Sequence, residues 1–197
     1  MESGQGTASD EPAWWSAAQA GDGEAFGRVF DLHHDRVYRH ACRVLDVRAD
    51  AEDVTAAAFL ELWRRRNSVR VVADSVLPWL LVTTTNLSRN VRRSTRRHRA
   101  LLERLPRDGT AADPAEVMLA SQPAGWDDAL VTHLRGLSRA DLALVTLVAL
   151  EGFTIAEAAA ALGLSVPAAK SRLHRVRHRP GLSPHLPPAL TSGRSHP

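Results

Sequence analysis

The chain has 197 residues, of which 44% are hydrophobic and 5% aromatic, and its formal net charge is +3. This length fits one domain or two small ones of ordinary globular composition. A single cysteine, Cys42, excludes an internal disulfide and a cysteine-based zinc site. The polar, acidic N-terminus and the absence of an apolar run of about 18 residues argue against a secretory signal and a membrane span. We therefore expect a cytoplasmic protein without membrane insertion.

The charges are unevenly distributed along the chain. Residues 1–63 contain twelve acidic residues and five arginines, whereas residues 64–104 contain eleven arginines and two acidic residues. Lys170 is the only lysine, so nearly all positive charge comes from arginine. The planar guanidinium of arginine can donate two parallel hydrogen bonds to one phosphate. A GC-rich genome would produce the same arginine bias. The asymmetry nevertheless predicts one surface for a polyanion and another for a different partner.

Helical patterns dominate the first half of the chain. We predict helices over residues 13–20, 24–45, 51–66 and 75–104, with a turn at 46–50 and a loop at 67–74. Residues 106–125 are rich in proline, glycine and acidic side chains, which predicts a flexible linker with one short helical turn near 116–120. Further helices are expected at 126–136 and 138–151.

These patterns together predict an all-α fold of two small helical domains. The first domain covers residues 1–105, the linker covers 106–125, and the second domain covers 126–180. The proline-rich residues 181–197 are expected to form a disordered tail.

Two short helices with a tight turn between them are predicted within residues 154–179. Thr154 and Glu157 have the spacing of a capping box, Gly163 is placed to end the first helix in a left-handed conformation, and Ser165 is placed to cap the second. The second helix has an apolar face and an outer face rich in basic residues. The apolar face consists of Val166, Ala169, Leu173 and Val176. This pattern is typical of a helix-turn-helix that enters a DNA major groove.

The alternative for this segment is an ordinary solvated helix. Basic residues occupy positions 170, 172, 175, 177 and 179 with no acidic residue among them. Solvated faces usually mix both signs of charge, so the pattern favours DNA binding.

Four segments carry a family resemblance, namely residues 25–45, 50–66, 77–97 and 134–177. An AEDV…FLELWRR helix, a PWL…N…RR helix, a linker and a helix-turn-helix ending in KSRL follow one another in that order. This combination resembles the extracytoplasmic-function (ECF) group of bacterial RNA polymerase sigma factors. The resemblance implies that the chain binds core RNA polymerase, directs it to promoters, and has no catalytic activity and no cofactor.

The resemblance also implies where polymerase binds. In the family, the AEDV helix docks on the coiled coil of the largest polymerase subunit, and an anti-sigma factor often holds the protein inactive. No feature of this sequence identifies such an anti-sigma partner. Ala56 and Ala57 replace the Gln-Glu pair of many relatives, which predicts weaker binding to core. The corresponding polymerase-binding residues here are Asp53, Phe59, Leu60 and Trp63; packing in the core is the alternative for Phe59 and Trp63.

Promoter contacts are implied for both domains. The loop at 67–74 and the helix after it correspond to the part of the family that recognises and opens the −10 element. That helix contributes Trp79, Asn86, Arg89, Asn90, Arg92 and Arg93, with a core position as the alternative for Trp79. The second domain corresponds to the part that reads the −35 element as duplex. Base edges would be read by Lys170, Ser171, His174 and Arg175, and phosphates would be held by Arg172, Arg177 and Arg179.

Two other classes of function fit parts of the sequence. A stand-alone helix-turn-helix regulator explains the second domain but not the charge pattern of the first. An enzyme is disfavoured because His33, His34 and Asp35 are consecutive on a helix and point about 100° apart. His174 and His178 share a helix face, but no third ligand accompanies them, so no metal site is predicted.

Overall fold

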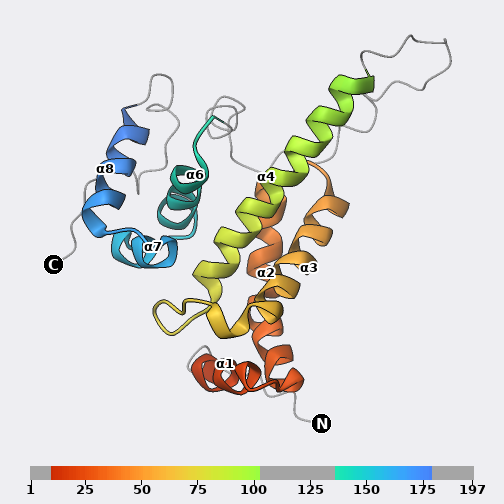
Figure 1. Ribbon diagram of the computed structural model, residues 1–197, viewed down its shortest axis with the longest axis vertical. Coiled ribbons are helices and arrows are strands. Elements are labelled where there is room, and N and C mark those ends of the chain that lie inside the picture. The colour runs from red at the N-terminus through yellow and green to blue at the C-terminus, as the bar shows by residue number, and fades with distance from the viewer. Residues whose placement is uncertain (1–9, 103–135, 179–197) are drawn as a thin grey trace.

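The computed structural model describes residues 10–102 and 136–178, and within these ranges the regular structure is helical (Figure 1). The only β-type pairing among these residues is an isolated bridge between Val72 and Ser75. The prediction of an all-α fold is therefore confirmed for the described residues. The division into two domains stays a prediction, and the expected helix at 126–136, the linker with its turn at 116–120, and the tail lie outside the described residues.

Four long helices and one short turn make up the first part. Three of these helices begin and end within two residues of the predicted positions. The fourth was expected to start at residue 51 and begins three residues earlier. Asp50 lies in its first turn, where a carboxylate interacts favourably with the helix dipole. The elements are α1 (Glu11–Gln19), α2 (Gly23–Val44), α3 (Arg48–Arg64), the 3-10 turn η2 (Arg66–Ser68) and α4 (Leu77–Leu102).

Buried polar groups join α1 to the start of α4. The Glu11 side chain is buried, and its Oε1 accepts hydrogen bonds from Val76 N at 2.7 Å and Ser75 Oγ at 3.0 Å. The same oxygen lies 2.9 Å from Nε2 of His33 on α2. One carboxylate thus satisfies a backbone donor next to the N-terminus of α4 and connects three segments that are distant in sequence.

The second part contains α6 (Arg139–Val145), the π-helical segment η4 (Thr146–Leu150), α7 (Ile155–Leu162) and α8 (Val166–Arg177). The sequence predicted one regular helix over residues 138–151, and this prediction was wrong in its second half. The wider π turn of η4 places Leu147 and Val148 in the core and ends beside Gly152, whose φ is +76°. Ser138 does cap α6, as predicted, by accepting a hydrogen bond from Asp141 N.

The two parts lie against each other along α4 (Figure 1). This helix contacts α2 and α3 on one side, and α6, η4 and α7 on another. A single cluster of buried apolar side chains includes Leu62 and Leu80 of the first part and Leu144 and Leu173 of the second. The side of α4 that faces the second part includes Asn90 of the predicted −10 surface, whose Oδ1 accepts a hydrogen bond from Arg139 NH2 at 3.2 Å.

Candidate nucleic-acid interface

Local hydrogen bonds fix the turn between α7 and α8. Thr154 N donates to Glu157 Oε2 at 2.8 Å, and Glu157 N donates to Thr154 Oγ1 at 3.2 Å, which confirms the predicted capping box. Gly163 has a φ of +67°, and the next amide, Leu164 N, donates to Ala159 O at 2.8 Å. Ser165 Oγ accepts from Ala168 N. The sequence signals therefore define both ends of the turn and set the direction of α8.

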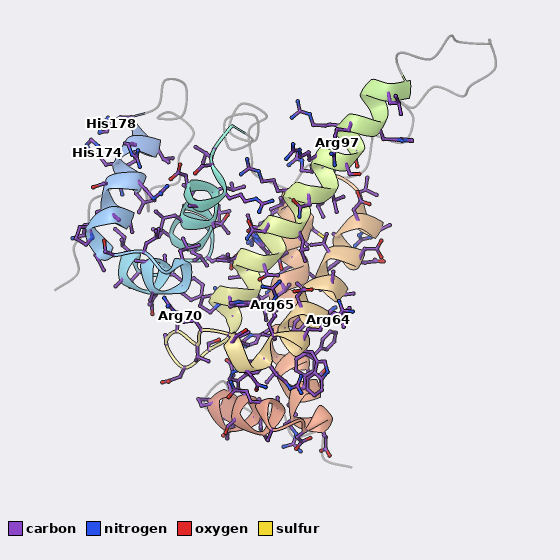
Figure 2. All side chains as sticks on the ribbon, in the orientation of Figure 1. Arg64, Arg65, Arg70, Arg97, His174 and His178 are labelled. Atoms are coloured by element: carbon purple, nitrogen blue, oxygen red, sulfur yellow. The ribbon has the colours of Figure 1, made fainter. Side chains whose placement is uncertain are left out.

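The faces of α8 separate largely as predicted. Ala169, Leu173 and Val176 are buried, but Val166 is 38% exposed because it is the first residue of the helix and lies beyond the core. The exposed residues include the four expected to read bases, namely Lys170, Ser171, His174 and Arg175. Figure 2 shows His174 and His178 at the end of α8, and their ring centroids are 4.2 Å apart.

Arg172 differs from its neighbours on α8 because it already has a carboxylate partner. Its NH1 lies 3.0 Å from Asp141 Oδ1 on α6, and Ser138 Oγ donates to the other carboxylate oxygen at 2.6 Å. Partial burial disfavours the charged carboxylate, but the hydrogen bonds from Ser138 and Arg172 outweigh it and lower the pKa of Asp141. Arg172 therefore fixes α8 to α6 in this structure. Arg177 is half-buried, and Arg179 lies outside the described residues.

The predicted −10 residues of α4 have distinct environments. Trp79 is half-buried against the core. Asn86 and Arg89 are also half-buried. Arg92 NH1 donates to the Val44 carbonyl at the end of α2, at 2.7 Å, so this arginine supports the fold. Arg93 is exposed.

Exposed basic residues continue past Arg93 towards the end of α4. Arg96, Arg97 and His98 are exposed, and Figure 2 shows Arg97 on the part of α4 that projects beyond α2 and α3. These three side chains were not among the predicted site residues, although they lie in the arginine-rich stretch of residues 64–104. The sequence alone could not show that these side chains are exposed whereas Arg92 is half-buried, because all of them are basic.

The loop before α4 has an unexpected backbone conformation. Ala73 and Asp74 have φ values of +50° and +56°, and Val72 and Ser75 exchange both backbone hydrogen bonds around them. Two consecutive left-handed residues form a tight turn that usually requires glycine or asparagine. The turn leaves Val71 40% exposed at the loop surface. An alanine in this position stores backbone strain, and such strain is common in loops that bind ligands.

The predicted polymerase-binding residues divide into two groups. Asp53 is exposed and Leu60 is 48% exposed, and the two residues lie on the same face of α3. Phe59 is only 3% exposed and packs on Phe30 with ring centroids 4.6 Å apart, so the core alternative applies to it. Trp63 is half-buried, and its ring packs on that of Phe26 in a T-shaped arrangement with the ring centroids 5.0 Å apart.

A hollow of about 390 Å³ lies beside this face, between α2 and α3. Ala56 is one of the residues that line it, and its short side chain fills little of the hollow. The remaining lining residues are Phe30, His34 and Tyr38 from α2 and Glu52 and Thr55 from α3. The surface thus combines apolar rings with acidic side chains, which suits a basic partner that also carries an apolar residue.

Comparison with known proteins matches both parts of the chain. The Sigma-70 region 2 family matches residues 29–98, and the Sigma-70, region 4 family matches residues 127–179. The chain is 34% identical over 179 residues to the ECF RNA polymerase sigma factor SigE of Mycolicibacterium smegmatis, which covers 87% of this chain and 67% of that protein.

A second relative is longer than the matched region. The ECF RNA polymerase sigma factor BldN of Streptomyces coelicolor is 31% identical over 160 residues, and the match spans 80% of this chain but 60% of BldN. Among solved structures, CnrH in complex with the cytosolic domain of CnrY has a TM-score of 0.56 at 24% identity, covering 88% of this chain and 95% of that one. At this identity the match supports the fold alone.

No helix among residues 10–102 and 136–178 is both long enough and apolar enough to cross a membrane.

Proposed function

The chain belongs to the ECF RNA polymerase sigma factors, and we propose that it binds core RNA polymerase and directs the enzyme to specific promoters. The observation that carries this proposal is the pair of basic surfaces on α8 and α4, which accompany an acidic and apolar face on α3. Two nucleic-acid surfaces and one protein surface on a single chain are what promoter-directed recruitment requires.

For the −35 element, we propose that α8 lies in the major groove. Lys170, Ser171, His174 and Arg175 are exposed near one another on this helix, and the capped turn after α7 holds it rigidly. A well-formed side-chain contact to a base edge contributes about 1–3 kcal/mol of discrimination. Arg177 would bind phosphate and add affinity without sequence preference.

For the −10 element, we propose that the loop at 67–74 and α4 bind opened DNA. Exposed Val71 and the strained turn at Ala73 would face an unstacked base, and Asn86 and Asn90 carry amides that can pair with base edges. Arg93, Arg96 and Arg97 would follow the phosphates towards the end of α4.

For the polymerase, we propose that Asp53 and Leu60 contact the coiled coil of the largest subunit. Exposed apolar side chains next to a carboxylate form an anchor point, and the hollow lined by Ala56 would receive an apolar side chain of the partner. Phe59 is buried beneath this face and supports it through its packing on Phe30.

The proposed role needs no chemistry from this chain, because the polymerase performs the reaction. We therefore propose that the protein is not an enzyme and that it acts in the cytoplasm, where the polymerase and promoters are. Solved relatives include the sigma factor RpoE in complex with the anti-sigma factor NepR from Bartonella quintana. By analogy, we propose that an anti-sigma factor is a further partner of this chain.

Transcription from a genomic DNA library by core polymerase plus the purified chain tests this proposal. We expect new transcripts that share a two-element promoter motif. The variant Asp53→Ala/Leu60→Ala removes two exposed side chains, so it should lose core binding by about 100-fold or more while it keeps its fold and its duplex binding. If wild type binds specific duplexes but never associates with core, the chain is instead a stand-alone regulator.

A further inference from the structure

The loop that precedes α4 is anchored at both of its ends by side chains of α1. At the end of the loop, Oε1 of buried Glu11 accepts hydrogen bonds from Val76 N at 2.7 Å and from Ser75 Oγ at 3.0 Å. At the start of the loop, Gln19 Nε2 donates to the carbonyl of Arg66, in η2, at 2.9 Å. Figure 1 shows α1 beside this loop. Two polar residues of one helix therefore fix both ends of the loop.

Apolar packing brings α1 and the loop together but does not fix the loop backbone. Trp15 and Ala18 of α1 belong to the same buried apolar cluster as Val69 and Val76 of the loop. Contacts of this kind are favourable but have no preferred direction. Hydrogen bonds require a defined distance and angle between donor and acceptor. The polar residues at the two ends of α1 therefore determine where the loop backbone lies.

Ser75 connects Glu11 to the strained turn of the loop. Its Oγ donates to Glu11 and accepts a hydrogen bond from Leu77 N, in the first turn of α4, at 3.1 Å. Its backbone exchanges two hydrogen bonds with Val72 across the turn that contains Ala73. The left-handed conformation of Ala73 is costly and persists only where the surrounding contacts enforce it. Glu11 supplies such a contact from outside the loop.

The Glu11 carboxylate depends on the loop as much as the loop depends on it. The side chain of Glu11 is 3% exposed, and its other polar contact is His33 on α2, whose Nε2 lies 2.9 Å from Oε1. A buried carboxylate that loses its hydrogen-bond donors carries a large desolvation penalty. Movement of Val76 and Ser75 away from α1 would therefore leave Glu11 poorly satisfied, which favours one position of the loop.

We propose that α1 positions the loop at 67–74 for capture of an unstacked −10 base, with Glu11 and Gln19 as the positioning residues. Glu11 is buried and acts through Ser75 and Val76, which precede α4. A loop that already has its binding conformation loses less freedom when DNA binds. The role in base capture rests on the proposed function, because that function assigns the −10 element to this loop. The anchoring of the loop by α1 does not depend on DNA.

Amide hydrogen exchange of the full chain, followed by NMR, tests the anchoring without DNA. Glu11→Ala removes the acceptor of the Val76 amide, so this amide should exchange at least about tenfold faster. Glu11→Gln keeps an oxygen acceptor and should stay within about threefold of wild type. Glu24→Ala is the matched control and should leave the Val76 amide unchanged. Glu24 is also an acidic residue in the first turn of a helix, but it is exposed and pairs with Arg28 within α2.

The anchoring is overturned if the Val76 amide exchanges at the wild-type rate in Glu11→Ala, or if Glu24→Ala accelerates it equally. If Glu11→Ala does not fold, Gln19→Ala decides in its place, because Gln19 is only half-buried. Loss of the Gln19 contact should accelerate exchange of the Ser68 amide, which donates within η2, by at least about threefold. An unchanged Ser68 amide in this variant then overturns the anchoring.

Base discrimination by the chain bound to core RNA polymerase tests the positioning. A labelled single-stranded oligonucleotide with the −10 sequence is compared with oligonucleotides in which one base is replaced. Glu11→Ala should reduce the ratio of these affinities by about fivefold or more, the lower limit of what one base contact contributes. Binding to the −35 duplex should stay unchanged. Glu11→Gln should restore the ratio, and Glu24→Ala should match wild type.

A purely structural role of Glu11 would lower stability without changing this ratio in the folded protein. An unchanged ratio in Glu11→Ala therefore overturns the positioning, and so does a loss in Glu11→Gln as large as that in Glu11→Ala. If wild type itself does not distinguish the oligonucleotides, the positioning falls together with the proposed −10 role. Hydrogen exchange still decides in that case whether α1 anchors the loop.

Discussion

The arginine-rich helices α8 and α4 look alike in sequence but differ in how their basic side chains are used. On α8, Arg172 is bound to Asp141, while Arg175 and Lys170 are exposed. On α4, Arg92 binds the end of α2 and only the later arginines are exposed. Charge density in the sequence therefore shows which helices are basic but not which of their arginines are exposed. Nearby carboxylate and carbonyl groups bind Arg172 and Arg92, and the proposed DNA contacts are assigned to the exposed arginines.

The largest expected difference concerns Arg175 and Arg172 on α8. Arg175→Ala should weaken binding to the preferred −35 duplex by about 10- to 100-fold and leave binding to scrambled duplex nearly unchanged, because it removes a base contact. Fluorescence anisotropy with both duplexes measures this. Arg172→Ala is the paired variant and should lose affinity equally on both duplexes, through a less rigid α8. An equal loss for Arg175→Ala would contradict its assignment to base reading.

The second prediction concerns the exposed end of α4. Arg96→Ala/Arg97→Ala should weaken binding of single-stranded −10 DNA uniformly across sequences, because phosphate contacts carry no sequence information. The slope of log affinity against log salt should decrease by roughly 0.7 for each contact removed. A titration at four salt concentrations measures the slope, and an unchanged slope would show that these arginines do not touch the backbone.

The third prediction separates Arg92 from its neighbours on α4. Arg92→Ala should lower the free energy of unfolding by about 1–2 kcal/mol, because it removes a charged hydrogen bond from the Val44 carbonyl. Arg93→Ala is the control from the exposed face and should change stability by less than about 0.5 kcal/mol. Urea denaturation measures both. If the two variants have the same stability, Arg92 does not support the end of α2.

The sequence predicted those features that depend on neighbouring residues. Thr154, Glu157, Gly163 and Ser165 define the ends of α7 and α8 through local hydrogen bonds, and each was placed correctly. The features that it missed depend on residues far apart. Glu11 and Val76 are separated by 65 positions, and nothing near either of them indicates the other.

The sequence also did not predict two unusual backbone conformations. Ala73 adopts a left-handed conformation that alanine disfavours, because the surrounding loop enforces it. The π turn at Thr146–Leu150 keeps the apolar pattern of a regular helix and differs only in hydrogen bonding. Phe59 could not be assigned to core or surface, because an apolar residue at that spacing suits both.

The smallest expected effect is the pH dependence of the Asp141 contact with Arg172. The hydrogen bonds from Ser138 and Arg172 outweigh partial burial and lower the pKa of Asp141 in the folded protein. The contact therefore stabilises the fold above the ordinary pKa of an aspartate, about 4, and this stabilisation is lost as the pH falls through the folded pKa. The stability difference between wild type and Asp141→Asn should therefore be larger at about pH 5 than at about pH 3. Urea midpoints at both values measure this, and a constant difference would contradict it.

Site-specific crosslinking within a promoter complex tests the division of labour between α8 and α4 most directly. A photoreactive residue placed at Ser171 or at Arg97, both exposed, reports which DNA each helix touches in the presence of core polymerase. We predict that position 171 crosslinks to duplex at the −35 element and that position 97 crosslinks to DNA near the −10 element. Crosslinks from both positions to one element, or identical crosslinks without core polymerase, would contradict the account.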